Sequence, residues 1–253
     1  MSNHPNFKNR VGEIKKNLRG TTMEIIEYNG TLDITVLFEN GDIKKCTYNN
    51  FKTGSVNSVL DRTVEGVGYI GQGKHIPSEI KKYSTWKNMF TRCYNARTNT
   101  EKRSYADSTV CDEWHNFQRF GEWFDKNYYS IGEQQMQLDK DIILKGNKLY
   151  SPKHCIFVPS CINKLFTKTN FLRGDLPIGV TVRNSKGTFV SRSCNQLTMK
   201  RKYLGDFDTK EEAFYAYKTY KEAHIKEVVD YYKETIPNAL YTALYRYEVS
   251  ITD

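Results

Sequence analysis

Two Asn-Gly pairs constrain the fold of the N-terminal region more than any other feature of this sequence. The pairs, at 29–30 and 40–41, separate three runs in which apolar and polar residues alternate, at 23–28, 32–38 and 43–48. Asn-Gly between alternating runs is a strong signal for a β-hairpin, because type I′ turns need positive φ at both central residues. We therefore predict a small, SH3-like β-barrel-like module over 1–75, with the glycine-rich stretch 66–73 as its linker.

Aromatic side chains recur at helical spacing in the middle of the chain. Two stripes stand out: Trp86, Met89, Phe90 and Cys93, and then Trp114, Phe117, Phe120 and Phe124. Positions with this spacing lie on one face of a helix, and Ser84 is the predicted N-cap of the first one. Aromatic stripes of this kind are far more often core than binding surface, so we predict that both are buried.

The C-terminal region has the clearest pattern of local structure. Three antiparallel strands are predicted from alternating runs at 179–183, 188–194 and 201–207. Thr209 and Glu212 then match a capping box, which starts an amphipathic helix reaching about residue 233. A shorter helix is expected over 238–247, after Pro237.

The segment before these strands predicts a strand and turn over 138–147, a short strand within 150–159 and a helix over 161–168. The chain is therefore expected to be α+β in three parts. These are the β module at 1–75, a part with aromatic-rich helices at 76–172, and a three-stranded antiparallel sheet packed on one helix at 173–253.

The net charge of +9 is concentrated in one quarter of the chain. Residues 142–205 contain 12 Lys and Arg but a single acid, Asp175, whereas 1–141 carry a net +2 and 206–253 a net −4. Such a block can follow a phosphate backbone and gain affinity from released counterions. The alternatives are a solvated basic face or a surface for an acidic protein.

The six cysteines, at 46, 93, 111, 155, 161 and 194, are dispersed and form no CxxC pair. This argues against a secreted disulfide framework and against a ribbon-type zinc site. No apolar run approaches the ~18 residues of a membrane span, and the N-terminus has no signal-peptide core. A cytoplasmic protein without a membrane partner is expected, in the host cytoplasm if the chain is encoded by a phage.

Residues 178–222 resemble the ethylene-response-factor (APETALA-type) DNA-binding domain. The resemblance rests on these pieces: Gly179-Val180, Phe189, Arg192, Tyr203-Leu-Gly-Asp-Phe207, Thr209 to Ala213, and Ala216-Tyr217. It implies that the sheet enters the DNA major groove, where Arg183 and Arg192 would contact bases. The run Lys200, Arg201 and Lys202 would hold phosphates. The aromatic residue common in the first turn of that family is replaced by Asn184-Ser185, so the family's sequence preference is not carried over.

Residues 83–166 resemble phage and prophage proteins of the HNH (ββα-metal) endonuclease type. The matching pieces include Tyr83 to Trp86, Arg92 to Asn95, Val110 to Trp114, Leu138 to Ile142, Gly146-Asn147, Tyr150 to Pro152, Cys155 to Val158 and Asn163. The resemblance implies a metal ion held by Asp139 and Asn163, and two oxygen ligands suit Mg²⁺ or Mn²⁺. The alternative is that Asp139 only caps a turn and Asn163 only caps a helix.

The position of the general base departs from the HNH pattern, because Lys140 stands where that family has a histidine. An ammonium group of ordinary pKa near ~10.4 is a poor base at neutral pH. Asp141 and His154 are the residues that could take its place. The resemblance also raises a structural Zn²⁺ site at Cys93, Cys111 and Cys155, with Cys161, His115 or His154 as fourth ligand. The alternative is that these thiols are small buried hydrophobes.

Two functions from different classes follow. The first is double-stranded DNA binding by a phage-type protein of HNH ancestry, which is also a candidate metal-dependent DNA-nicking endonuclease. The second is a catalytically inactive binding protein, such as a phage counter-defence or host-takeover factor that binds a host protein or shields DNA. Neither the DNA target nor the oligomeric state can be predicted from the sequence.

Overall fold

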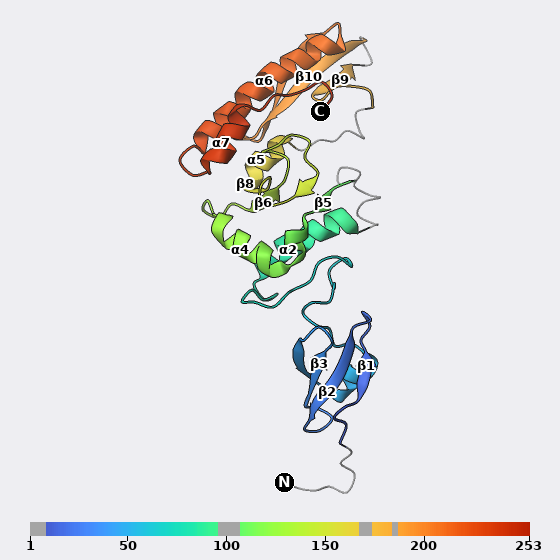
Figure 1. Ribbon diagram of the computed structural model, residues 1–253. Coiled ribbons are helices and arrows are strands. Elements are labelled where there is room, and N and C mark those ends of the chain that lie inside the picture. Colours follow the sequence, from blue (N-terminus) through green and yellow to red (C-terminus); the bar gives the residue numbers. More distant parts are fainter. Residues whose placement is uncertain (1–8, 96–106, 167–173, 184–186) are drawn as a thin grey trace. The chain divides into compact units, whose positions relative to one another are not determined.

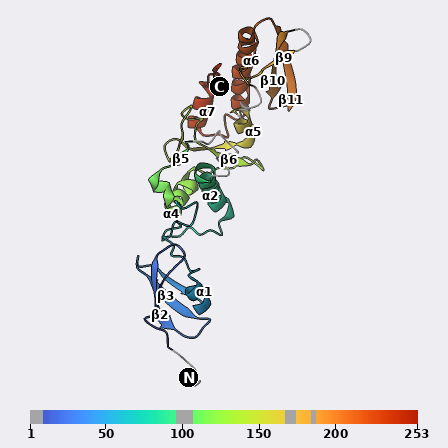
Figure 2. The same ribbon diagram turned by 90° about the vertical axis from the view of Figure 1, so that its right-hand side faces the viewer.

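Helices and small separate sheets alternate along the chain, which confirms the predicted α+β class (Figures 1 and 2). The structure is a computed structural model that describes residues 9–95, 107–166, 174–183 and 187–253. By their contacts the residues form two units: unit 1 is 1–126 with 148–151, and unit 2 is 127–147 with 152–253. This division does not follow the three predicted parts: the aromatic helices fall in the same unit as the N-terminal sheet, and 127–147 and 152–166 fall in the same unit as the C-terminal region.

The N-terminal sheet is an antiparallel meander whose strands follow chain order. Its strands are β1 (Ile14–Lys16), β2 (Thr22–Tyr28), β3 (Ile34–Phe38) and β4 (Ile43–Cys46). Met23, Ile25, Val36 and Phe38 are buried together with Phe51 of α1 (Tyr48–Thr53). The predicted hairpins are confirmed. The predicted barrel is wrong, because among the described residues β1 and β4 do not pair and the sheet stays open.

The turn types in this sheet differ from the prediction. A type I′ turn needs positive φ at its Asn, but neither Asn29 nor Asn40 is among the described non-glycine residues with positive φ. In the second hairpin the amide of Phe38 bonds the carbonyl of Asp42, the amide of Gly41 bonds the carbonyl of Phe38, and Gly41 has φ +83°. This is a three-residue loop closed by a left-handed glycine, so Gly41 rather than Asn40 supplies the unusual backbone conformation.

The rest of unit 1 is built around the aromatic stripes. Its elements are α2 (Ile80–Tyr94), the 3-10 helix η2 (Asp112–His115), α4 (Phe117–Asn127) and a parallel pair of β5 (Thr109–Val110) with β7 (Leu149–Tyr150). Both stripes are buried as predicted, with Trp86, Trp114 and Phe120 fully enclosed. Helix α2 begins before the predicted cap: Ser84 lies inside it and donates to the carbonyl of Lys81.

Unit 2 contains two antiparallel arrangements. In the first, β6 (Met136–Asp139) pairs with β8 (Ile156–Pro159), and the chain enters the short helices α5 (Ser160–Asn163) and η3 (Lys164–Phe166) directly afterwards. The second is the predicted three-stranded sheet. It has the order β11-β10-β9, with β9 at Val180–Arg183, β10 at Thr188–Asn195 and β11 at Lys200–Phe207.

Helix α6 (Lys210–Tyr231) connects the two parts of unit 2. It begins at the predicted capping box of Thr209 and Glu212. Its first half packs on the sheet through Ala213, Phe214 and Tyr217. Its second half shares a core with β8, α5 and α7 (Asn238–Tyr245), and this core includes Val158, Ile162, Ile225, Val228, Val229, Leu240 and Leu244. A single helix therefore carries both hydrophobic clusters of the unit.

Within the part of the chain that the structure describes, no helix combines the length and the apolar character needed to cross a membrane.

Candidate functional site

The outer face of the C-terminal sheet presents Arg192 in its central strand. Arg192 is exposed, whereas Ser191 and Ser193 on either side of it are buried. Because alternate residues of a strand face opposite sides and α6 packs on one side of this sheet, Arg192 points away from the helix. Its partner across the strand pair is Tyr203, which is 52% exposed. A guanidinium and an aromatic ring therefore lie side by side on the open face.

The neighbouring strand begins with three consecutive cations. Lys200, Arg201 and Lys202 are all exposed at the start of β11, opposite the end of β10. The hairpin β10–β11 contains a single acidic residue, Asp206, near the end of β11. Figure 2 shows α6 along one side of β10 and β11, which leaves their other side uncovered by a helix. All three predicted phosphate-binding residues are on the same hairpin as Arg192. By strand alternation Arg201 lies on the face of Arg192, whereas Lys200 and Lys202 lie on the other face.

Arg183 is in a different situation from Arg192. Its Nη1 lies 3.0 Å from Asp206 Oδ2, and both side chains are about one-third exposed. Since Arg183 is on β9 and Asp206 on β11, this ion pair crosses over the central strand β10. Arg183 therefore already has an acidic partner, and base contact by this residue remains a prediction.

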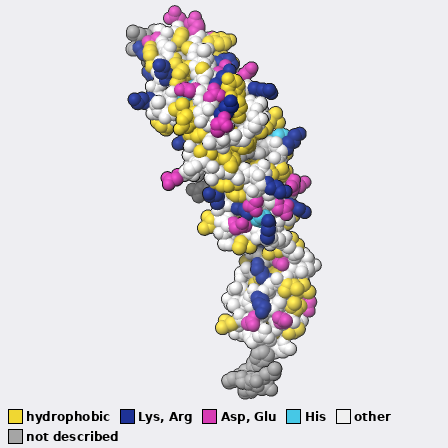
Figure 3. All heavy atoms as spheres, turned by 90° about the vertical axis from the view of Figure 1, so that its left-hand side faces the viewer, with side chains coloured by type: hydrophobic (Ala, Val, Ile, Leu, Met, Phe, Trp, Pro, Cys, Tyr) yellow, Lys and Arg dark blue, Asp and Glu magenta, His cyan; other side chains and the backbone are white. Residues whose placement is uncertain are grey.

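The basic block of the sequence is only partly visible as a surface. Lys168, Arg173 and Lys186, together with the turn residues Asn184 and Ser185, lie outside the described residues. On the face shown in Figure 3, Lys and Arg side chains are interspersed with Asp and Glu. The hairpin is thus the part of the block where four described cations, Arg192, Lys200, Arg201 and Lys202, stand against one acid, Asp206.

The predicted metal ligands Asp139 and Asn163 lie on one side of β6. Asp139 Oδ1 accepts hydrogen bonds from the amides of Asp141 and Ile142, at 2.8 Å each. Asn163 Nδ2 donates to Gln137 Oε1 at 2.5 Å. Gln137 and Asp139 are two residues apart on a strand and so face the same side. Burial raises the pKa of Asp139 to about 6, and the charge of Asp141 adds to the rise.

The oxygen atoms of these two side chains suit a single hard cation in type, although Asp139 Oδ1 already accepts the two amide hydrogen bonds that close the turn after β6. Because Asn163 contacts Gln137 through Nδ2, its Oδ1 is still able to accept or to bind a cation. The surroundings of Asp139 disfavour its negative charge, so a bound cation would stabilise the carboxylate. Mg²⁺ is commonly held by one or two protein oxygens while waters and phosphates complete its shell. Among the described residues there is no group of three or more His, Cys, Asp or Glu that could hold a metal ion. The two-ligand site therefore stays a prediction.

Lys140, Asp141 and His154 occupy distinct environments. Lys140 is 6% exposed, and its ammonium donates to the carbonyl of Asn147 at 3.0 Å and to Asp141 Oδ2 at 3.3 Å. Asn147 Nδ2 returns a bond to the carbonyl of Lys140. Lys140 therefore braces the turn that follows β6. Asp141 is about half exposed, and His154, just before β8, is half-buried.

None of the six cysteines, all of which lie in the described part of the chain, forms a disulfide. Cys93 and Cys155 are buried and Cys111 is half-buried, and burial raises the pKa of the Cys111 thiol. These environments match the small-hydrophobe interpretation, and the zinc site remains a prediction.

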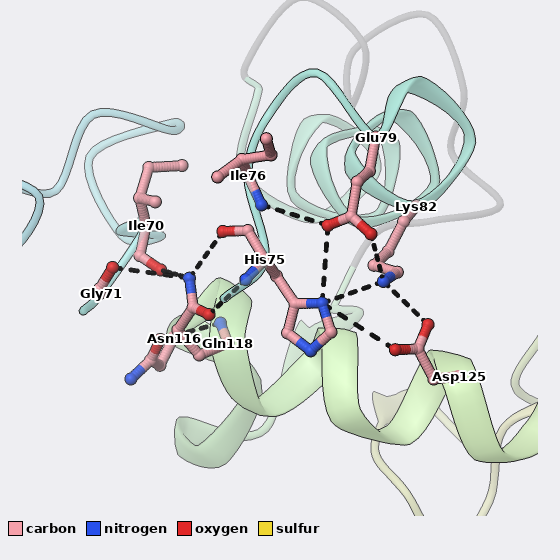
Figure 4. A network of polar contacts seen from close by, with 9 residues as sticks. All are labelled: Ile70, Gly71, His75, Ile76, Glu79, Lys82, Asn116, Gln118 and Asp125. Carbon is pink, nitrogen blue, oxygen red and sulfur yellow. Dashed lines mark hydrogen bonds and ion pairs between the residues drawn. The ribbon is translucent and has the colours of Figure 1, made fainter. Parts of the chain in front are cut away.

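A buried polar network in unit 1 was not predicted from the sequence (Figure 4). Lys82 on α2 is 6% exposed, and its ammonium lies 2.7 Å from Glu79, 2.7 Å from Asp125 and 2.9 Å from His75 Nδ1. Gln118 on α4 accepts from the amide of His75 and donates to its carbonyl. The network ties the segment before α2 to both helices.

Electrostatics hold Lys82 in its charged form. Burial by itself would lower the pKa of Lys82, but the hydrogen bonds to Asp125 and Glu79 outweigh it and raise that pKa. The bond from Lys82 lowers the pKa of the Glu79 carboxyl in turn. His75 accepts from Lys82 at Nδ1, and its buried Nε2 has no hydrogen-bond partner among the described residues. The spacing of Lys82 four residues before Trp86 is the signal that would have located it on the buried face.

We expect Gly121→Ala to destabilise this network. A Cβ on Gly121 would lie 2.5 Å from the ring of His75, which Lys82 and Gln118 hold in place. Overpacking of this kind costs about 1–3 kcal/mol, more than the roughly 1 kcal/mol that Ala gains over Gly in a helix. Urea unfolding measures the change. Glu122→Ala, at an exposed position of the same helix, is the control and should be nearly neutral. Equal stability of the Gly121→Ala variant and the wild type would show that the segment around His75 moves freely.

A second buried cation lies in unit 2. Lys221 on α6 is 7% exposed, and no described residue forms a hydrogen bond or ion pair with its amine. Burial lowers the pKa of Lys221 to about 8, against a small opposing effect of Cys194 on β10. The hydroxyls of Ser191 and Ser193 on β10 are likewise buried without a described partner. The largely buried amine of Lys221 and these two serine hydroxyls are therefore polar groups of α6 and β10 for which no described residue is a hydrogen-bond partner.

Comparison with known proteins gives no match: no family model, no curated protein and no solved structure matches the chain. Both resemblances remain predictions, and function has to be inferred from the geometry.

Proposed function

We propose that this chain binds double-stranded DNA through the hairpin β10–β11 and the open face of its sheet. The supporting observation is the position of Arg192, exposed in the central strand beside Tyr203, with Lys200, Arg201 and Lys202 on the adjoining strand. A two-stranded β ribbon fits the major groove of B-DNA, and a guanidinium can bond two guanine acceptors at once. The lysines supply phosphate contacts that set position without reading sequence.

Arg192 is the stronger candidate for base recognition. Arg183 can reach a base only by sharing or leaving Asp206, whereas no described acid pairs with Arg192. Arg183 would then help to orient the sheet, because its ion pair ties β9 to β11.

Arg192→Ala is expected to reduce discrimination between a selected duplex and a random one by roughly 10–100-fold, since one bidentate base contact is worth about 1–3 kcal/mol. Lys200→Ala should weaken all duplexes alike and reduce the salt slope by about 1. Arg246→Ala, at an exposed cation of the same unit outside the hairpin, is the matched control. Fluorescence anisotropy over a range of salt concentrations gives both quantities. A wild-type affinity that does not change with salt would refute the proposal.

Metal-dependent DNA nicking is the second candidate function. It is favoured by Asp139 and Asn163 lying on the same side of β6, with the pKa of Asp139 raised. A bound Mg²⁺ or Mn²⁺ would stabilise negative charge on the phosphate and on the leaving 3′ oxygen. Asp141 or His154 would accept the proton of the attacking water, because the ammonium of Lys140 is occupied in bracing the turn.

Conversion of supercoiled plasmid to the open circle with Mg²⁺ or Mn²⁺ tests this second function. An intact plasmid with either metal, together with salt-dependent DNA binding, would leave a protein that binds or shields DNA without cutting it. An intact plasmid and no DNA binding would contradict both DNA functions and favour the alternative of a protein that binds a host protein.

A further inference from the structure

The tip of the hairpin β10–β11 exposes two large apolar side chains. Leu197 is 39% exposed and Met199 is 65% exposed, and they flank Thr198 in the turn between the strands. Single exposed apolar residues are common on protein surfaces. Two of them at the end of a hairpin, directly followed by Lys200, Arg201 and Lys202, form a compact arrangement, which we call the apolar tip.

The apolar tip is held in place from both sides. Asn195 Oδ1 accepts from the amides of Leu197 and Thr198, at 3.0 Å each, and so closes the turn. The amide of Gln196 donates to Nε2 of His224 on α6, at 2.8 Å. His224 is 2% exposed, and its Nδ1 lies 2.8 Å from Glu227. The tip is therefore anchored to the helix beneath the sheet, and its outward side chains are preorganised.

Met199 occupies a backbone conformation that methionine rarely adopts. Met199 has φ +57°, a left-handed conformation that favours Gly or Asn. Glycine would form this turn without strain but would remove the side chain. The hydrogen bonds of Asn195 and Gln196 hold the turn in this strained conformation. Strained residues of this kind cluster at functional sites.

Charge decides which partner the tip fits. The one acid of the hairpin β10–β11 is Asp206, near the end of β11 and paired with Arg183, and three cations follow the apolar pair at once. A partner must therefore offer negative charge next to an apolar space. Double-stranded DNA offers both, because phosphates flank the gap that opens when two base pairs unstack.

We propose that Leu197 and Met199 insert as a wedge between base pairs and bend the duplex, while Lys200, Arg201 and Lys202 hold the flanking phosphates. This inference rests on the proposed DNA binding and adds a change in DNA shape to it. A hairpin that bends DNA gains contact area from the bend, which offsets the cost of unstacking.

The test compares wild-type protein with Leu197→Ser/Met199→Ser on a duplex that carries a fluorescent donor and acceptor at its ends. The matched control is Leu144→Ser/Ile251→Ser, which removes two exposed apolar side chains of the same unit away from the hairpin. We expect the wild type and the control to bring the ends together, and the Leu197→Ser/Met199→Ser variant to lose most of that signal at saturating protein. Its affinity should fall about tenfold on intact duplex, and the loss should shrink on a duplex with a mismatched, already unstacked step. Circular dichroism and urea unfolding check that each variant folds.

The outcomes separate this inference from the function on which it rests. If the wild type does not bind duplex at low salt, both proposals fail. If Leu197→Ser/Met199→Ser binds and bends DNA as the wild type does, DNA binding stands and the wedge is refuted. Binding of the tip to vesicles rich in phosphatidylserine, lost in the same variant and without DNA bending, would assign it to a membrane surface and overturn the inference.

Discussion

Lys221→Met is expected to raise the free energy of unfolding by about 3 kcal/mol at pH 7. Burial lowers the pKa of Lys221 to about 8 from an ordinary 10.5. Each unit of such a shift is worth about 1.4 kcal/mol of preference for the neutral form. At pH 7 the wild type must fold with an ammonium that is largely removed from water, and methionine keeps most of the apolar stem without that charge.

The pH dependence follows from the direction of the shift. Between about pH 8 and 10.5 the unfolded chain binds more protons than the folded one, so wild-type stability rises with pH over this window. The advantage of the Lys221→Met variant should therefore be constant below about pH 8 and vanish by about pH 10.5. Lys218→Met, on the same helix, is the control: it removes a bond of 2.6 Å to Glu222 and should lower stability. Urea unfolding of the wild type, Lys221→Met and Lys218→Met across this pH range measures the effect. A lower stability of Lys221→Met than of the wild type would mean that the Lys221 amine has a stabilising partner.

Asp139→Asn is the second change with a large expected effect, and it should act in opposite directions on stability and on activity. The charged carboxylate disfavours the folded state, because burial and Asp141 raise its pKa from 3.8 to about 6. Asparagine retains an Oδ1 that can accept from the amides of Asp141 and Ile142. We expect a gain of about 3 kcal/mol in the free energy of unfolding at pH 7, and complete loss of any metal-dependent nicking.

The sign of this effect can be checked by pH. Between about pH 3.8 and 6 the folded chain binds more protons than the unfolded one, so wild-type stability falls as pH rises through this window. The advantage of Asp139→Asn should be absent below about pH 4 and complete above about pH 6. Asp175→Asn, at an exposed acidic position of the same unit, is the matched control and should change stability little. Unchanged nicking in Asp139→Asn would remove this residue from the candidate metal site.

The elements were predicted well where the signal is local. Alternation over a few residues located β2, β3 and the strands of the C-terminal sheet, and the Thr209–Glu212 spacing located the start of α6. Barrel closure was not predictable in this way, since it depends on whether β1 meets β4, a pairing of distant segments that no local pattern specifies. The late predicted start of α2 has a similar origin: Ser84 is a good cap by type, yet the hydrogen bonds of the helix already include it.

The sequence predicts on which strand or helix the candidate site residues lie, but not their burial or their ion-pair partners. The sequence placed Arg183 and Arg192 on adjacent strands, but only the register showed that Asp206 pairs with the first and leaves the second exposed. Lys82 and Lys221 were missed because charged residues were assigned to the surface by type. Their spacing from Trp86 and from Tyr217 puts each on a buried helical face, so periodicity applied to cations as well as to apolar residues would have found them.

Helix α6 has a consequence for any attempt to dissect this protein. A fragment starting at residue 173 would keep the sheet but strip Val158, Ile162 and their neighbours from the second half of α6, which would expose Ile225, Val228 and Val229. A fragment ending at 172 would lose the other side of the same core. A fragment meant to keep the hairpin and the β6–β8 pair on their shared core therefore has to include both 127–166 and 174–253.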